Sequence, residues 1–124
     1  MPIRAQAMPE PWQVRFTNGG HTATADTHKN GVGGGAGLRP HELLEAALAS
    51  CMTITARMAL AEKGVDDTGL GLEVEVVRTE TTTTFQYTLH LPAALEPHRD
   101  LVTAAVERSP VRMTLSKALS FEAK

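Results

Sequence analysis

The sequence contains a single cysteine, Cys51, and so cannot form a disulfide within one chain. A lone thiol is either a buried core side chain or a reactive group. One cysteine cannot complete a cysteine-based zinc site, and the five histidines show no metal-ligand spacing. We therefore expect no metal and no bound cofactor.

An excess of charge of either sign is also missing, since 12 Lys and Arg face 14 Asp and Glu, for a net charge of -2. This balance gives no long-range attraction to nucleic acid or to anionic lipid, so we expect neither as a partner. The first eight residues contain no apolar run long enough for a signal peptide, which predicts a cytoplasmic protein. A chain of 124 residues, 42% of them hydrophobic, suits a single domain, 1–124, with its own core.

The longest periodic segment runs from Pro40 to Lys63 and contains no internal glycine or proline. Proline near the start and Gly64 just past the end are typical of one helix. The segment is apolar around most of its circumference, which predicts a helix buried in the core. Glu45 and Arg57 within it argue against a membrane span.

The residues before this helix predict a β-hairpin and a glycine-rich loop. Residues 1–11 carry three prolines and no periodicity, so they are predicted to form a loose arm or an edge segment. Alternation from Trp12 to Phe16, a turn at Asn18–Gly20 and a return over 22–26 predict two paired strands. The glycines of 28–38 lack the ending of a phosphate-binding P-loop, so we expect a flexible loop there.

The residues after the long helix predict further strands and two helices. Alternation over 70–77 and 84–91 predicts two antiparallel strands, and an amphipathic helix is expected over 97–108. Ser109-Pro110 is typical of the start of a short helix with Ser109 as its N-cap. Alternation over 119–123 predicts a last strand. This order of elements is that of an α+β fold with a mostly antiparallel sheet.

Two motifs lie around Cys51 and the short helix. The first is Pro-x-Glu-Leu-Leu-x-Ala-Ala-Leu-x-Ser-Cys, from Pro40 to Cys51, and the second is Arg-Ser-Pro-Val-x-x-Thr-Leu-Ser, from Arg108 to Ser116. Together they resemble the osmotically inducible protein C and organic hydroperoxide resistance family, OsmC/Ohr, over most of the chain from about Trp12. The resemblance implies the OsmC-like fold, an intertwined homodimer with central long helices, and protection from oxidative stress by thiol-dependent reduction of organic hydroperoxides.

By this resemblance Cys51 occupies the position of the peroxidatic cysteine, and Ser109 occupies that of the resolving cysteine. Cys51 lies about three turns past Pro40, too far from the helix N-terminus for the helix dipole to lower the pKa of its thiol. The start of the short helix could still polarise a peroxide or stabilise a sulfenate through the Ser109 hydroxyl and free amides. Without a second thiol, an external thiol reductant is expected.

The resemblance also points to residues that could supply charge to the thiol. His41 stands where hydroperoxide reductases carry a glutamate, and Glu42 retains a second acidic position of the wider family. His21 stands where those reductases place an arginine after an early Gly-Gly. Arg39 and Arg112 are the remaining candidates. Each of these residues has an alternative interpretation as an ordinary solvated side chain.

Two functions follow from these observations. The first is a cytoplasmic, dimeric, one-cysteine peroxidase that acts on a small apolar hydroperoxide. The alternative is a non-catalytic protein that binds a small molecule and uses Cys51 for packing. In a dimer, we expect Cys51 to face an interface pocket lined by Leu44, Leu48 and Met58.

Overall fold

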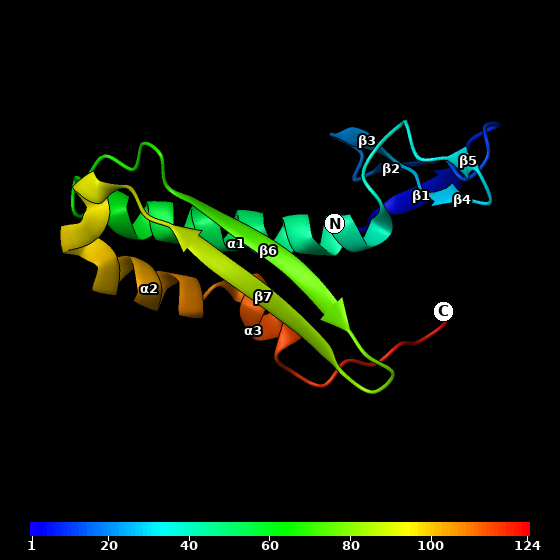
Figure 1. Ribbon diagram of the computed structural model, residues 1–124. Coiled ribbons are helices and arrows are strands. Elements are labelled where there is room, and N and C mark those ends of the chain that lie inside the picture. Colours follow the sequence, from blue (N-terminus) through cyan, green and yellow to red (C-terminus); the bar gives the residue numbers. More distant parts are fainter. The chain divides into compact units, whose positions relative to one another are not determined.

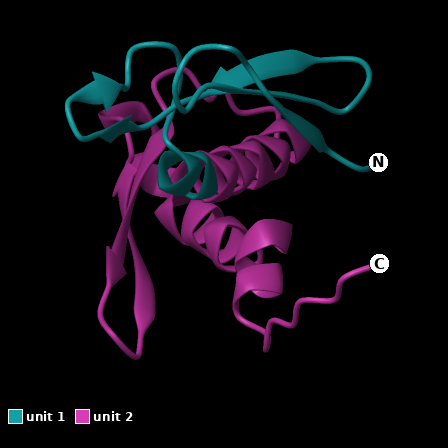
Figure 2. Ribbon diagram, turned by 90° about the vertical axis from the view of Figure 1, so that its right-hand side faces the viewer, with its two compact units in different colours: residues 1–44 teal, residues 45–124 magenta.

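The computed structural model describes residues 1–124 and divides them into two compact units, an N-terminal unit of residues 1–44 and a C-terminal unit of residues 45–124 (Figure 2). The boundary falls within one continuous helix, α1 (Pro40–Glu62). Because the two units share this helix, the expectation of a single domain stays a prediction.

The N-terminal unit contains a three-stranded antiparallel sheet in the order β1 (Arg4–Ala7), β2 (Val14–Thr17) and β3 (Thr22–Ala25). The predicted turn joins β2 to β3, where the side chain of Asn18 accepts hydrogen bonds from the backbone N–H groups of Gly20 and His21. Residues 4–7 pair with β2 along its other side. They therefore form an edge strand, which is the second of the two alternatives, a loose arm or an edge segment, that the sequence left open for 1–11.

The glycine-rich segment forms a short hairpin, β4 (His28–Lys29) and β5 (Val32–Gly33), where the sequence predicted a flexible loop. The buried carboxylate of Asp26 accepts hydrogen bonds from the backbone of Thr27 at 2.7 Å and of Ala36 at 3.1 Å. Burial raises the pKa of Asp26, but hydrogen bonds from backbone N–H groups of this segment lower it by more. The segment is thus organised around an ionised side chain that lies outside the glycine run.

Gly37→Ala should destabilise the protein, because a Cβ atom at Gly37 would overlap the carbonyl oxygen of Thr24. Backbone cannot give way as a flexible side chain can, so we expect a loss of about 2 kcal/mol or more in the free energy of unfolding. Urea denaturation of the full chain measures this. Gly35→Ala is the matched control, since a Cβ there meets nothing within 4 Å. Equal midpoints for the two variants would disprove the close approach.

The C-terminal unit packs a β-hairpin and three short helical elements against α1 (Figure 1). The hairpin consists of β6 (Gly71–Arg78) and β7 (Thr83–His90), and the 3₁₀ helix η1 (Ala93–His98), α2 (Arg99–Glu107) and α3 (Pro110–Leu115) follow it. The side chain of Glu45 on α1 accepts a hydrogen bond from the backbone N–H of Val76 at 2.8 Å. The buried core comprises apolar residues of α1, η1 and α2: Leu48, Met52, Ala56, Ala59, Leu60, Leu95, Val102, Ala105 and Val106.

Helix α1 is buried along one face only, whereas the sequence predicted burial around most of its circumference. The opposite face carries exposed apolar side chains at helical spacing, and Met58 among them is 64% exposed. By length and composition alone α1 could cross a membrane, but its buried face forms the core of the C-terminal unit. The exposed residues, called the α1 stripe below, are Leu44, Ala47, Ile54, Met58 and Ala61.

The strand predicted over 119–123 is not formed, and residues 118–124 have no regular secondary structure. Leu119 is exposed, and the side chain of Phe121 is 95% exposed. Alternation shows which side chains share a face, but a strand also needs a neighbouring edge to pair with. No strand of this single chain pairs with the tail.

Candidate functional site

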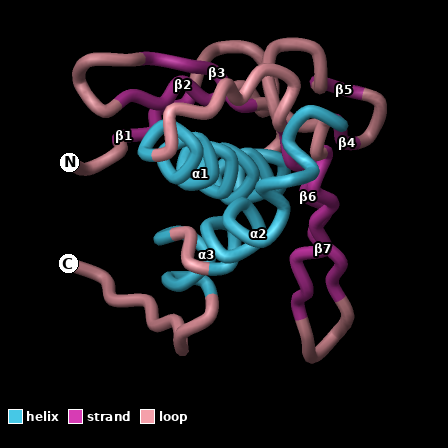
Figure 3. Tube along the Cα trace, turned by 90° about the vertical axis from the view of Figure 1, so that its left-hand side faces the viewer, coloured by secondary structure: helices cyan, strands magenta, loops and turns pink.

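Cys51 lies in the middle of α1, beside the start of α3. The backbone N–H of Val111 donates a hydrogen bond to the Cys51 sulfur, with the two atoms 3.5 Å apart. This N–H is free because the first N–H groups of a helix have no partner within it. Ser109 immediately precedes α3 and is fully buried. The fold therefore brings Cys51 and Ser109 to one place from positions far apart in the sequence, and Figure 3 shows α1, α2 and α3 grouped together.

The Ser109 hydroxyl does not cap α3, although Ser109 occupies the N-cap position that the sequence predicted for it. Its oxygen is the one buried side-chain nitrogen or oxygen atom in the protein without a hydrogen-bond partner. Leaving a buried hydroxyl unpaired costs free energy, so a further role is needed to explain it. The hydroxyl proton is free to turn toward the sulfur when Cys51 ionises.

The pKa of Cys51 lies below that of an ordinary thiol. Burial raises this pKa, but donation to the ionised sulfur by the Ser109 hydroxyl, the Val111 N–H and the Thr55 hydroxyl lowers it by more. Thr55 lies one turn further along α1, and in the resting protein its single hydroxyl proton is donated to the carbonyl oxygen of Cys51, at 2.8 Å. It must turn away from that carbonyl to reach the sulfur. Neutral donors therefore favour the thiolate, which is the nucleophilic form of cysteine.

Ser109→Ala should raise the pKa of Cys51, because it removes one of the three donors that stabilise the thiolate. The stability of the fold should fall little, since the lost hydroxyl has no partner in the resting protein. The rate of alkylation of Cys51, followed against pH, reports the shift. Ser120→Ala, in the exposed tail, is the control. If both variants gave the same pH profile, Ser109 would have no influence on the thiol.

Four of the candidate residues, His21, Arg39, His41 and Glu42, belong to the N-terminal unit and are exposed. The carboxylate of Glu42 accepts a hydrogen bond from the backbone N–H of Arg39 at 2.8 Å, which is one half of a capping box. Glu42 thus helps to begin α1. It lies nine residues before Cys51, about 13 Å along the helix. Catalytic roles for these four residues stay predictions.

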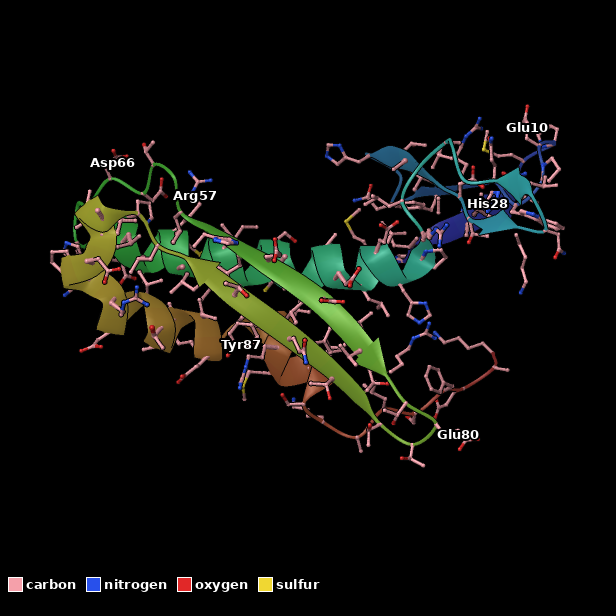
Figure 4. The ribbon with its side chains drawn as sticks, in the orientation of Figure 1. Glu10, His28, Arg57, Asp66, Glu80 and Tyr87 are labelled. Atoms are coloured by element: carbon pink, nitrogen blue, oxygen red, sulfur yellow. The ribbon has the colours of Figure 1, made fainter.

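A cavity of about 260 Å³ lies in the C-terminal unit between α1, β7 and α3. Leu48 and Met52 line it from α1, Tyr87 (labelled in Figure 4) lines it from β7, and Arg112 lines it from α3. Leu48 was predicted to line a pocket, but Leu44 and Met58 belong to the exposed α1 stripe. The dimer pocket expected around Cys51 therefore stays a prediction.

Metal-ligating side chains do not gather anywhere in this structure. No group of three or more His, Cys, Asp or Glu residues is placed to hold a metal ion.

These elements form an α+β protein whose single thiol lies between a long helix and the start of a short one. The OsmC-like protein family matches residues 33–124, and the chain belongs to this family.

Solved structures share this fold over most of the chain. An OsmC-like protein from Mycoplasma pneumoniae is 19% identical, with a TM-score of 0.69, and the match covers 92% of this chain and 85% of that one. An organic hydroperoxide resistance protein OsmC from Legionella pneumophila is 17% identical, with a TM-score of 0.62, and the match covers 93% of this chain and 88% of that one. The organic hydroperoxide resistance protein OhrB of Bacillus subtilis is 18% identical, with a TM-score of 0.60, and the match covers 93% of this chain and 89% of that one. Comparison with curated proteins finds no match.

Proposed function

We propose that this protein is a one-cysteine peroxidase that reduces organic hydroperoxides with an external thiol. The observation that carries the proposal is the Cys51 sulfur, which receives the Val111 N–H beside the buried, unpartnered hydroxyl of Ser109. These donors lower the pKa of the thiol, as a peroxidatic cysteine requires. Two structures of the same fold are named for organic hydroperoxide resistance, which supports the substrate class.

In the first step the Cys51 thiolate attacks the terminal oxygen of the hydroperoxide. The oxygen–oxygen bond breaks, a sulfur–oxygen bond forms, and the alkoxide leaves and takes up a proton to become the alcohol. Two electrons pass from sulfur to the peroxide, so Cys51 becomes a sulfenic acid. The Ser109 hydroxyl and the Val111 N–H, which favour the thiolate beforehand, can then donate to the sulfenate.

In the second step an external thiol must restore Cys51, since the chain has no other cysteine. This thiol attacks the sulfenic sulfur, water leaves, and a mixed disulfide forms. A second external thiol then releases Cys51 as a thiol and departs as a disulfide with the first. A sulfenic acid that waits for this reductant is open to further oxidation to the sulfinic acid.

The proposal includes a homodimer and a cytoplasmic location. The α1 stripe is an exposed row of apolar side chains on the helix that carries Cys51, and pairing two such stripes would remove it from water. The cytoplasm is where thiol reductants keep cysteines reduced, as the second step needs.

The reductant dependence of turnover tests this proposal. Without added thiol, the protein should consume about one equivalent of cumene hydroperoxide per chain, and with a dithiol it should continue to turn over. Continued turnover without any thiol would exclude the one-cysteine cycle. If the protein consumed no cumene hydroperoxide with or without thiol, the peroxidase proposal itself would be wrong.

The alternative is a binding protein without catalysis, which the missing second cysteine and the cavity beside α3 both favour. In that case Cys51 would react with hydroperoxides no faster than a free thiol, and Cys51→Ala would leave ligand affinity almost unchanged. An apolar ligand that co-purifies with a protein whose thiol is inert would decide for this alternative.

A further inference from the structure

The cavity of the C-terminal unit is lined by apolar side chains, by hydroxyl-bearing side chains and by a single charged one. Leu48, Met52, Phe85 and Leu115 supply much of its lining, and hydroxyl groups of threonine, serine and tyrosine supply polar atoms. Arg112 is the only charged residue that lines it. An apolar pocket with one fixed charge is suited to a ligand that has an apolar body and one group of opposite charge.

The charge of Arg112 is not neutralised by any carboxylate of the protein. Its guanidinium donates one hydrogen bond, to the backbone carbonyl oxygen of Glu107 at 3.0 Å, and this bond helps to hold the side chain in place. The ion pairs of the protein are Arg57–Asp67 and Glu96–Arg99, and neither includes Arg112. The remaining N–H groups of the guanidinium are therefore available to a ligand.

Cys51 itself does not line the cavity, but residues next to it and next to its hydrogen-bond donor do. Leu48 and Met52 flank Cys51 along α1, one turn before it and one residue after it. Arg112 directly follows Val111, whose backbone N–H reaches the Cys51 sulfur. A ligand anchored at Arg112 would thus lie along the same contact between α1 and α3 that holds Cys51.

We propose that this cavity binds a small organic acid with an apolar body, and that its carboxylate pairs with Arg112. A guanidinium matches a carboxylate with two parallel hydrogen bonds, which are strengthened because both partners are charged. The volume of about 260 Å³ lies just below the range of roughly 300–1,000 Å³ for typical ligand pockets, so the bound part is short. If the proposed function holds, the preferred hydroperoxide carries a carboxylate, and Arg112 determines this specificity.

The test measures binding of octanoic acid and 1-octanol by calorimetry at neutral pH. The protein is the full chain carrying Cys51→Ala, so that no thiol chemistry interferes. We expect the acid to bind more tightly than the alcohol. Adding Arg112→Gln should weaken binding of the acid about ten-fold or more and change binding of the alcohol little, because a charge-assisted hydrogen bond is lost. Arg112→Lys, which keeps the charge, should retain part of the preference.

Arg108→Gln is the matched control, since Arg108 is exposed, lies four residues before Arg112 at the end of α2 and does not line the cavity. It removes the same charge and should leave both affinities unchanged. The inference is overturned if acid and alcohol bind equally, if neither binds, or if Arg108→Gln weakens the acid as much as Arg112→Gln. Thermal unfolding of each variant checks that the fold is intact.

The outcomes also separate this inference from the proposed peroxidase function. If the acid binds through Arg112 but Cys51 is inert to hydroperoxides, the binding inference holds and the peroxidase proposal fails. If the protein turns over cumene hydroperoxide but does not bind the acid, the peroxidase proposal holds and the binding inference fails.

Discussion

Cys51→Ala should abolish the reduction of organic hydroperoxides, with a fall in kcat/KM on the order of a thousand-fold or more. The sulfur of Cys51 is the only atom in the chain that can take the peroxide oxygen through a cysteine thiolate. Consumption of cumene hydroperoxide in the presence of a dithiol measures the loss.

Ser50→Ala is the control for this change, because Ser50 is the neighbouring exposed residue and its hydroxyl only donates to the carbonyl oxygen of Ala47 on the same helix. It should keep the activity of the unmodified protein. If Cys51→Ala retained turnover, another group would have to carry the reaction and the proposed mechanism would be wrong.

If the unmodified protein is the proposed dimer, the doubly substituted protein Ile54→Glu, Met58→Glu should be a monomer in light scattering, at half the mass of the unmodified protein. Both side chains belong to the α1 stripe and are exposed in the single chain. Burying an apolar side chain of this size contributes about 1.5–3 kcal/mol, and a buried, unpaired carboxylate opposes association further.

Ala46→Glu adds negative charge at an exposed position of α1 outside the stripe, and it should leave the dimer intact. If light scattering of the unmodified protein gave the mass of one chain, the dimer would be refuted outright. A dimer that survives both substitutions in the stripe would place the interface elsewhere.

The elements that could be predicted from sequence are those set by local interactions. Helix α1 ends at Glu62, within one residue of the prediction, because proline near its start, Gly64 after its end and an uninterrupted apolar pattern are local signals. The hairpin of β2 and β3 follows from its Asn-Gly-Gly turn.

The features that could not be predicted depend on distant partners. The glycine-rich segment forms a hairpin because the carboxylate of Asp26 accepts its backbone N–H groups, and nothing in the glycine run reveals this. The tail over 119–123 alternates like a strand, but this chain offers it no edge. The exposed face of α1 is apolar without a core to cover it, so composition alone overestimated its burial.

The candidate site was predicted only in part. The resemblance placed Cys51 and Ser109 at matching positions, and the start of the short helix was expected to provide free amides. The sequence indicated cations as the groups that could lower the pKa of the thiol, whereas within this chain the groups that lower it, Ser109, Val111 and Thr55, are neutral donors. Thr55 could have been noticed, because a hydroxyl four residues after a helical cysteine lies on the same face.

The most direct test of the central claim is the intact mass of the purified full chain after treatment with one equivalent of cumene hydroperoxide in the absence of thiol. We predict the addition of one oxygen atom at Cys51, which a dithiol removes. In a parallel sample, dimedone added before any dithiol should convert this sulfenic acid into a stable thioether adduct. A chain that keeps its thiol unmodified under these conditions, and gives no dimedone adduct, would contradict a peroxidatic role for Cys51.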